Sequence, residues 1–315
     1  LYRGHDVMPW CPRCGTALSE HEIATEGYAE RTHLALTVGL PLQERSGEAL
    51  LVWTTTPWTL PANVAAAVHP ELTYVRLEPA QPTEHGWRGV WLAKDRVAAL
   101  QAAGVVRGWT QAEERLGSEL VGWRYRGPFD ELDAQAGVEH RVVAWDEVSA
   151  EDGTGVVHIA PGAGKEDFLL GRELGLAVLA PLDENGVYLA GYDWLSGRAA
   201  SGVAEDVAAN LEGKGVLFGR EQYTHRYPVC WRCGTDLLFR LADEWLISMD
   251  SLRHQMMDAA KEATWLPAFG LERELDWLRN MDDWMISKKR YWGLALPIYP
   301  CEHCGHVTVV GSRAE

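Results

Sequence analysis

Residues 11–18 read C-P-R-C-G-T-A-L and residues 230–237 read C-W-R-C-G-T-D-L, so one short motif occurs twice, far apart in the chain. Two cysteines at this spacing on a tight turn present both sulfur atoms to one tetrahedral metal ion, and the following glycine relieves the turn. Ordinary zinc ribbons separate their cysteine pairs by about 15 to 20 residues. Here 215 residues, positions 15 to 229, lie between Cys14 and Cys230. If both pairs bind one zinc ion, these residues form an inserted domain whose two ends are held together.

A third pair of the same kind lies in C-E-H-C-G at positions 301–305. It would form half of a second site completed beyond the end of this sequence, unless His303 and His306 add ligands. Pairing of Cys230 and Cys233 with this third pair also remains open. Disulfides are the competing interpretation, although nothing in the sequence indicates secretion. The predicted metal ligands are Cys11, Cys14, Cys230, Cys233, Cys301 and Cys304.

The composition is that of a folded protein with room for two domains, because 47% of the 315 residues are hydrophobic and 23% are charged. No apolar run approaches the roughly 18 to 20 residues of a membrane helix, so we expect no membrane partner. The net charge of −16 disfavours a large sequence-independent nucleic-acid surface. The local exception is a basic cluster at Lys288, Lys289 and Arg290. The chain starts at Leu1 without a signal core, and we expect the natural protein to continue on that side.

Between the two distant cysteine pairs, short strand-like runs alternate with a few helical patterns, which favours a mixed, barrel-like α+β domain over a parallel sheet. The predicted strands are 34–40, 48–55, 72–78, 88–93, 140–145 and 155–160. The predicted helices of this region are 94–104, 165–175 and 203–213, and two more, 251–263 and 271–281, follow Cys233.

Two stretches of the inserted region have the residue types of a site. The first, W-T-T-T-P-W-T-L-P-A-N at 53–63, places consecutive threonine hydroxyls at a strand end, where prolines stop the ladder. The bland alternative is a threonine-rich strand end with solvated hydroxyls.

The second stretch, D-G-T-G-V-V-H-I-A-P-G-A-G-K-E-D-F at 152–168, runs through a strand and a glycine loop into a helix. Asp167 would lie in the first helical turn, where the macrodipole favours a carboxylate over its acid form, and it would suit an ammonium group. The alternatives are that Asp167 only helps to start the helix and that His158 is a core histidine. Gly164-Lys165 is not a nucleotide P-loop, because Ile159 and Glu166 occupy the positions of the required glycine and Ser or Thr.

Together these two stretches resemble the editing domain of isoleucyl-tRNA synthetases, which are class I aminoacyl-tRNA synthetases. The flanks agree, from C-P-R-C-G-T-A-L-S at 11–19 through H-R-Y-P-V-C-W-R-C-G-T at 225–235 to W-M-I-S-K-K-R-Y-W-G-L-A-L-P-I-Y at 284–299, so the resemblance covers nearly the whole chain. Valyl relatives share the threonine strand but usually have lysine where His158 stands.

The resemblance implies post-transfer editing, in which valine misattached to the 3′ end of tRNA(Ile) is hydrolysed in a pocket too small for isoleucine. The resemblance implies that Asp167 binds the α-ammonium group of the valine and that His158 helps to exclude isoleucine. It also implies that four threonines line the pocket and place the water: Thr54, Thr55, Thr56 and Thr59. It further implies that three residues support the pocket walls and the terminal adenosine: Trp53, Trp58 and Asn63. No serine or cysteine has a nucleophile setting, so direct attack by water is expected.

The resemblance also implies a structural zinc ion, because four thiolates leave no open position for water. The H-I-G-H-like and K-M-S-K-S-like signatures are not found, so ATP, magnesium and aminoacylation would belong to the parent enzyme only. The parent is expected to be a cytoplasmic monomer. The expected plan is a zinc knuckle and linker strand (1–30), the editing domain (31–220), the second knuckle and return strand (221–250), a helical segment leading back to the catalytic domain (251–300) and the second half-site (301–315).

Three other functions remain open. One is the editing region of a valyl-type synthetase, and another is a zinc-ribbon binding module without catalysis. The third is a metallohydrolase using His158 and Asp167, which lacks an evident third ligand.

Overall fold

The computed structural model describes residues 1–19, 22–24, 27–281, 283–287 and 295–314. The predicted basic cluster at Lys288, Lys289 and Arg290 lies outside the described residues. The chain divides into two compact units, a larger one of Asp6–Ala242 and a smaller one of Leu1–His5 with Asp243–Glu315. Strands β1 (Tyr2–Cys11) and β12 (Leu238–Ile247) run through the two boundaries between these units. Among the described residues, no helix is both long enough and apolar enough to span a bilayer.

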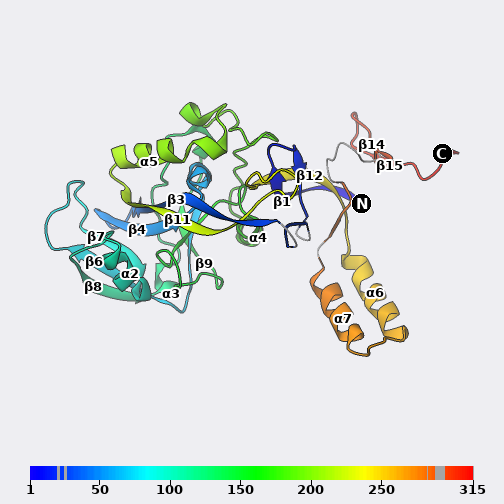
Figure 1. Ribbon diagram of the computed structural model, residues 1–315, viewed down its shortest axis with the longest axis horizontal. Helices are drawn as coiled ribbons and strands as arrows, with labels where there is room; N and C mark the ends of the chain where they lie inside the picture. Colours follow the sequence, from blue (N-terminus) through cyan, green and yellow to red (C-terminus); the bar gives the residue numbers. More distant parts are fainter. Residues whose placement is uncertain (20–21, 25–26, 282, 288–294, 315) are drawn as a thin grey trace. The chain divides into compact units, whose positions relative to one another are not determined.

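The larger unit contains a six-stranded mixed sheet with the order β11-β3-β4-β7-β6-β8 (Figure 1). Its strands are β3 (Tyr28–Pro41), β4 (Glu48–Thr54), β6 (Thr73–Pro79), β7 (Gly89–Ala93), β8 (Trp109–Leu116) and β11 (Leu217–Pro228). The β4–β7 pair is parallel, whereas the other neighbours are antiparallel. The helices of this unit are α2 (Val97–Ala102), α3 (Gly117–Leu120), α4 (Lys165–Leu174) and α5 (Ala204–Gly213).

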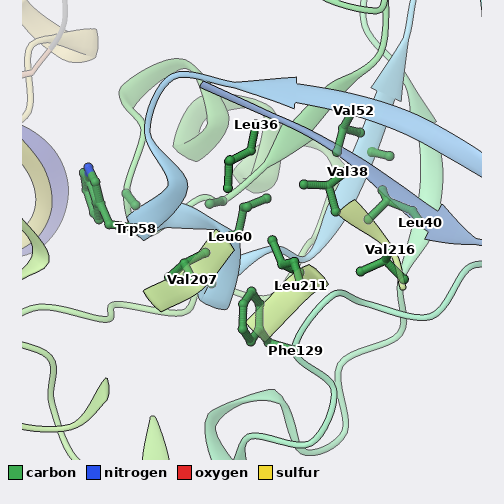
Figure 2. Packing of buried hydrophobic residues seen from close by; sticks show 14 of the residues in the cluster. Leu36, Val38, Leu40, Val52, Trp58, Leu60, Phe129, Val207, Leu211 and Val216 are labelled. Atoms are coloured by element: carbon green, nitrogen blue, oxygen red, sulfur yellow. The ribbon is translucent and has the colours of Figure 1, made fainter. Parts of the chain in front are cut away.

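Strand β4 is apolar along most of its length because both of its faces are buried. Leu50 and Val52 belong to a core that also takes Val207 and Leu211 of α5, and Figure 2 shows Val52, Val207 and Leu211 in this packing. The alternate residues of β4 pack on the opposite face with residues of β6, β7 and α2, in a second cluster made of Ala49, Leu51, Val75, Leu77, Val90, Leu92, Leu100 and Val106. A strand buried on both sides reads as a continuous apolar run, as the sequence does here.

A second, three-stranded sheet has the order β10-β5-β9. Its strands are β5 (Ala65–Val68), β9 (Arg141–Ala144) and β10 (Val157–Ile159). Strand β5 pairs antiparallel with β10 and parallel with β9. This sheet carries the two stretches that the sequence singled out, because the threonine segment leads into β5 and His158 lies on β10.

The smaller unit holds the helices α6 (Asp250–Glu262) and α7 (Gly270–Asn280), followed by β13 (Trp284–Met285) and the hairpin of β14 (Ile298–Pro300) and β15 (Val307–Val309). Near the N-terminal end of the larger unit, β2 (Thr16–Ala17) pairs with the end of β1. The structure also contains short 3-10 helices, of which η1 (Pro57–Ala62) matters for the site.

The predicted α+β class is confirmed, and each predicted strand and helix matches an element of the structure. The strands β2, β5, β8, β11, β13, β14 and β15 were not predicted, whereas β1 lies within segment 1–30 and β12 within segment 221–250, where a linker strand and a return strand were expected without exact bounds. Neither the six-stranded nor the three-stranded sheet closes on itself among the described strands, so a closed barrel is not what the sheets form.

Candidate functional site

The pairing of β5 with β10 brings the two singled-out stretches together. The threonine segment ends β4 and continues through η1 directly into β5. In the antiparallel register His158 lies opposite Ala66, so the histidine strand returns past the start of β5. Residues 99 positions apart thereby come into hydrogen-bonding distance, as Thr59 and His158 do at 2.8 Å.

A cavity of about 540 Å³ opens at this junction. All six residues predicted to be catalytic line it, together with Trp53, whereas their roles stay predictions. The lining residues are Trp53, Thr54, Thr55, Thr56, Thr59, Glu147, Ser149, Glu151, Asp152, Gly153, Thr154, Gly155, Val156, Val157, His158, Ala163, Gly164 and Asp167.

The threonine hydroxyls of the site form a local hydrogen-bonded chain rather than a solvated strand end. The backbone N–H of Thr56 donates to Thr54 Oγ1 at 3.1 Å, and the hydroxyls of these residues lie 3.2 Å apart. Thr59 Oγ1 donates to the carbonyl oxygen of Thr56 at 2.8 Å. Thr54 and Thr59 are buried, so the bland alternative of solvated hydroxyls does not describe them.

His158 is a buried, hydrogen-bonded histidine whose side chain also faces the cavity. It is 8% exposed, and burial lowers its pKa to about 4, so the imidazole is neutral at pH 7. Nε2 lies 2.8 Å from Thr59 Oγ1, and Nδ1 lies 3.4 Å from Nδ2 of Asn63. Both ring nitrogens therefore have protein neighbours, and the ring lines the cavity.

Asp167 lies in the first turn of α4, as predicted, and its side chain turns back toward the end of β10. The backbone N–H of Ala160 donates to Asp167 Oδ2 at 2.7 Å. The predicted preference for the carboxylate is outweighed, because burial raises the pKa of Asp167 to about 6 while the Ala160 bond lowers it only in part. A carboxylate with this desolvation gains from a bound cation.

The other three predicted residues occupy different surroundings. The indole N–H of Trp53 donates to Glu221 Oε1 at 3.1 Å, and its ring meets that of Tyr223 edge to face. Trp58 is a core residue outside this cavity, labelled in Figure 2. Asn63 is fully buried and touches the site through His158.

Two residues that the sequence did not single out hold Asn63 in place. Tyr125 donates its hydroxyl proton to Asn63 Oδ1 at 2.8 Å. The side-chain amide of Gln135 donates to the backbone carbonyls of Pro61 at 2.7 Å and Asn63 at 3.0 Å. Tyr125 lies outside the named helices and strands, and Gln135 ends the short 3-10 helix η3 (Asp133–Gln135); no local motif marks either residue.

Four of the six cysteines form a compact cluster in the larger unit: Cys11, Cys14, Cys230 and Cys233, whose sulfur atoms all lie within 4.8 Å of one another. The separations are 3.5 Å for Cys11–Cys233, 3.7 Å for Cys14–Cys233 and 4.0 Å for Cys14–Cys230. Four thiolates at Zn–S bonds of about 2.3 Å around a regular tetrahedron would be about 3.8 Å apart. This donor set could therefore hold a metal ion, and it joins the first cysteine pair to the second.

The disulfide interpretation is wrong for this structure, because all six cysteines are free. The sulfur separations in the cluster are also far longer than the about 2.05 Å of a disulfide. Burial raises the pKa of Cys11, whereas neighbouring Thr235, against the effect of burial, lowers the pKa of Cys233 to about 6. One thiolate is thus favoured before any metal enters.

The third pair adopts the same turn as the other two but is not part of the group of four clustered sulfur atoms. Gly305 donates its N–H to the carbonyl of Cys301 at 2.8 Å, as Gly15 does to Cys11 at 2.9 Å. Cys301 and Cys304 are exposed in the β14–β15 hairpin of the smaller unit. Their predicted role as half of a second metal site stays a prediction.

The family described as tRNA synthetases class I (I, L, M and V) matches residues 1–315. The chain therefore belongs to the class I tRNA synthetases of this group.

Among sequence relatives, the chain is similar to two isoleucine–tRNA ligases. It is 37% identical over 317 residues to that of Methanoregula boonei and 39% identical over 324 residues to that of Methanoculleus marisnigri. Each alignment covers 100% of this chain and 29% of the relative, so the chain spans less than a third of their length. The predicted resemblance to isoleucyl-tRNA synthetases is confirmed.

Among solved structures, the editing domain of the cytosolic leucyl-tRNA synthetase of P. knowlesi is 10% identical, with a TM-score of 0.46. The match covers 62% of this chain and 97% of that domain.

Proposed function

We propose that this chain performs post-transfer editing, the hydrolysis of valine misattached to tRNA(Ile). The observation that carries the proposal is the joint lining of one cavity by the threonine segment, His158 and Asp167. Singly, each stretch has an ordinary structural explanation. Together they supply a polar cavity with hydroxyls on one wall, a neutral imidazole on another and a carboxylate.

Asp167 would bind the α-ammonium of the valyl ester. Its carboxylate accepts a hydrogen bond from the N–H of Ala160, and burial still raises its pKa to about 6. An ammonium group at this carboxylate replaces the missing solvation and stabilises the charged form. The ester would thus be held at one end by its amino group.

The attacking group would be water placed by the threonine hydroxyls. Among the described residues lining the cavity there is one serine and no cysteine. That serine, Ser149, accepts a hydrogen bond from the N–H of Glu151 at 3.0 Å. Direct attack forms the bond between the water oxygen and the ester carbonyl carbon. The bond from that carbon to the ribose oxygen breaks, and a proton from the water ends on the ribose oxygen, so free valine and the ribose hydroxyl are released without an acyl-enzyme.

His158 would limit the size of the amino-acid side chain that the cavity accepts. Its ring is held from two sides, by Thr59 and Asn63, so it cannot turn away without losing buried hydrogen bonds. Isoleucine is one methylene larger than valine, and a fixed wall rejects the additional carbon at this second site.

The cluster of four cysteines would bind a structural zinc ion. The sulfur separations fit zinc, and four thiolates close its tetrahedron, so no water would be activated there. The zinc would hold the two ends of the inserted region together, in the domain plan expected from the sequence. A further zinc ion at Cys301 and Cys304 needs ligands from elsewhere.

The whole enzyme would ligate isoleucine to tRNA(Ile) with ATP and magnesium, as a cytoplasmic monomer. This chain would supply its correction step, with the tRNA 3′ end as the partner that enters the cavity.

The proposal is tested by incubating this chain, and separately its Asp167→Ala variant, with valyl-tRNA(Ile) and with isoleucyl-tRNA(Ile). We expect hydrolysis of the valyl ester alone, and its loss in the variant. A valyl-type editing region would instead hydrolyse threonyl-tRNA(Val) in preference. A non-catalytic zinc module would bind metal and hydrolyse none of these esters.

A further inference from the structure

The donors and acceptors around His158 determine which ring nitrogen carries the proton. Thr59 Oγ1 has one proton, and it is donated to the carbonyl of Thr56 at 2.8 Å. Thr59 must therefore accept from His158, so Nε2 carries the hydrogen and donates across 2.8 Å. In a neutral imidazole Nδ1 is then bare and accepts.

Asn63 supplies the matching donor on the other side of the ring. Its Nδ2 group donates to the carbonyl of Ala65 at 2.9 Å and lies 3.4 Å from His158 Nδ1. The Ala65 carbonyl determines the orientation of the Asn63 side-chain amide, because the reversed orientation would place Oδ1 of Asn63 next to the carbonyl oxygen of Ala65. The amide oxygen of Asn63 then faces Tyr125, which donates to it at 2.8 Å.

These bonds form one directed chain. Tyr125 donates to Asn63, Asn63 donates to His158, and His158 donates to Thr59. Tyr125 and Asn63 are each fully buried, so no water competes for these groups. The side-chain amide of Gln135 also holds Asn63 in place, because it donates to the backbone carbonyls of Asn63 and Pro61.

We infer that Tyr125 is a positioning residue, which acts through Asn63 to hold His158 as the Nε2–H tautomer and to fix its ring as a wall of the cavity. The inference about specificity rests on the proposed editing function, whereas the tautomer does not. Tyr125 lies 62 positions from Asn63 and outside both stretches that line the cavity.

The tautomer is tested by ring nitrogen NMR on the whole chain labelled with ¹⁵N-histidine, with the His158 signals assigned from a His158→Gln variant. We expect a protonated Nε2 and a bare Nδ1 in the unmodified protein. Asn63→Asp replaces the donor by a carboxylate, so we expect the proton to move to Nδ1. A protonated Nδ1 in the unmodified protein would overturn the inference.

The positioning role is tested with Tyr125→Phe, which removes only the hydroxyl. We expect discrimination between valyl and isoleucyl esters to fall about tenfold, as for loss of one buried hydrogen bond. The matched control is Tyr227→Phe, because Tyr227 is also buried and donates to the carbonyl of Leu237 at 3.0 Å, outside the cavity lining. Equal discrimination in Tyr125→Phe, Tyr227→Phe and the unmodified protein would overturn the role.

The two measurements separate the possible failures. If the unmodified protein hydrolyses no valyl ester, the proposed function fails, and the NMR result still decides the tautomer. If Tyr125→Phe does not fold, Asn63→Asp and the unmodified protein still decide whether the chain of donors sets the ring proton.

Discussion

Asp167 and His158 line the same cavity, and burial shifts both toward their neutral forms, Asp167 to a pKa of about 6 and His158 to about 4. At pH 7 the aspartate is still mostly ionised, while the histidine is neutral. The described residues that line the cavity include four acidic side chains, Glu147, Glu151, Asp152 and Asp167, and no lysine or arginine, so the cavity suits a cationic amino group and not an anionic one.

Replacing Asp167 by Asn should abolish editing and stabilise the fold. The amide can still accept from Ala160, but it removes the charge that would bind the ammonium, so we expect valyl-ester hydrolysis to fall at least about a hundredfold. The same change removes a desolvated charge, so the free energy of unfolding at pH 7 should rise by about 1 to 2 kcal/mol. Urea denaturation and deacylation rates measure both. A variant with full activity, or one destabilised at pH 7, would contradict this role.

Hydrolysis should decline as the pH falls through about 6. The pKa of Asp167 is raised in the folded protein, so the folded state binds a proton more readily than the unfolded one between about pH 4 and 6. The charged carboxylate is lost over that range even though the fold gains stability from this group. Because the pKa of His158 is lowered to about 4, this residue stays neutral above about pH 4 and adds no further change to the pH–rate profile in that range. A rate measured at constant substrate that stays flat from pH 7.5 to 5 would argue against an Asp167–ammonium contact.

Replacing His158 by Ala should weaken selection rather than hydrolysis. Removal of the ring opens the wall, so isoleucyl-tRNA(Ile) should become a substrate while the valyl ester is still hydrolysed. The comparison is the ratio of the two deacylation rates in the variant and the unmodified protein. An unchanged ratio would remove His158 from the specificity role.

At the scale of elements, the site depends on one strand pair and one loop. Strand β5 is A-A-A-V, and alanine is a weak strand former, so the sequence alone did not predict it. It forms because β9 and β10 bind it on both edges and all four residues are buried. Conversely, β4 and α4 were predicted from local patterns, since burial of both faces and a glycine before a helix leave local marks.

Tyr125 and Gln135 show why part of the site could not be predicted. Each acts on residues more than 60 positions away, Tyr125 from a stretch outside the named helices and strands and Gln135 from a three-residue 3-10 helix that is too short to show a periodicity. The threonine, histidine and aspartate positions could be proposed because they lie in dense motifs. Their convergence in one cavity needed the β5–β10 register, which no local pattern encodes.

The loop between β10 and α4 has no room for a side chain at Gly162. A Cβ atom there would lie 1.8 Å from the carbonyl oxygen of Leu179. Gly162→Ala should therefore shift the loop that leads to Asp167, lowering the free energy of unfolding by about 2 kcal/mol or more and reducing hydrolysis. The control is Gly213→Ala at the end of α5, where a Cβ meets nothing within 4 Å. Equal stability of the two variants would contradict the close approach.

At the scale of the whole molecule, the cysteine cluster ties residues near the start of the larger unit to residues near its end. Sequence spacing alone suggested that the first two pairs share a metal, but left pairing with Cys301 and Cys304 open. The structure groups Cys11, Cys14, Cys230 and Cys233, a choice made by the β1–β2 pair and the chain around Val229 rather than by the motifs themselves.

Reduced, freshly purified protein should contain at least one zinc ion per chain. Cys230→Ser should lose the zinc of the cluster and lower the free energy of unfolding by about 3 kcal/mol or more, because the metal closes a long loop. Cys304→Ser, with its sulfur outside the cluster, is the matched control and should retain that ion and its stability. Metal content well below one per chain in the unmodified protein would contradict a zinc cluster.

The central claim is that the cavity between the threonine segment and α4 removes valine from tRNA(Ile). Its most direct test is single-turnover deacylation of valyl-tRNA(Ile) and isoleucyl-tRNA(Ile) by this chain, with Asp167→Ala as the matched variant. We predict that the unmodified chain hydrolyses the valyl ester well above the spontaneous rate, spares the isoleucyl ester, and loses this activity in the variant. Equal rates for the unmodified chain and the Asp167→Ala variant would contradict it.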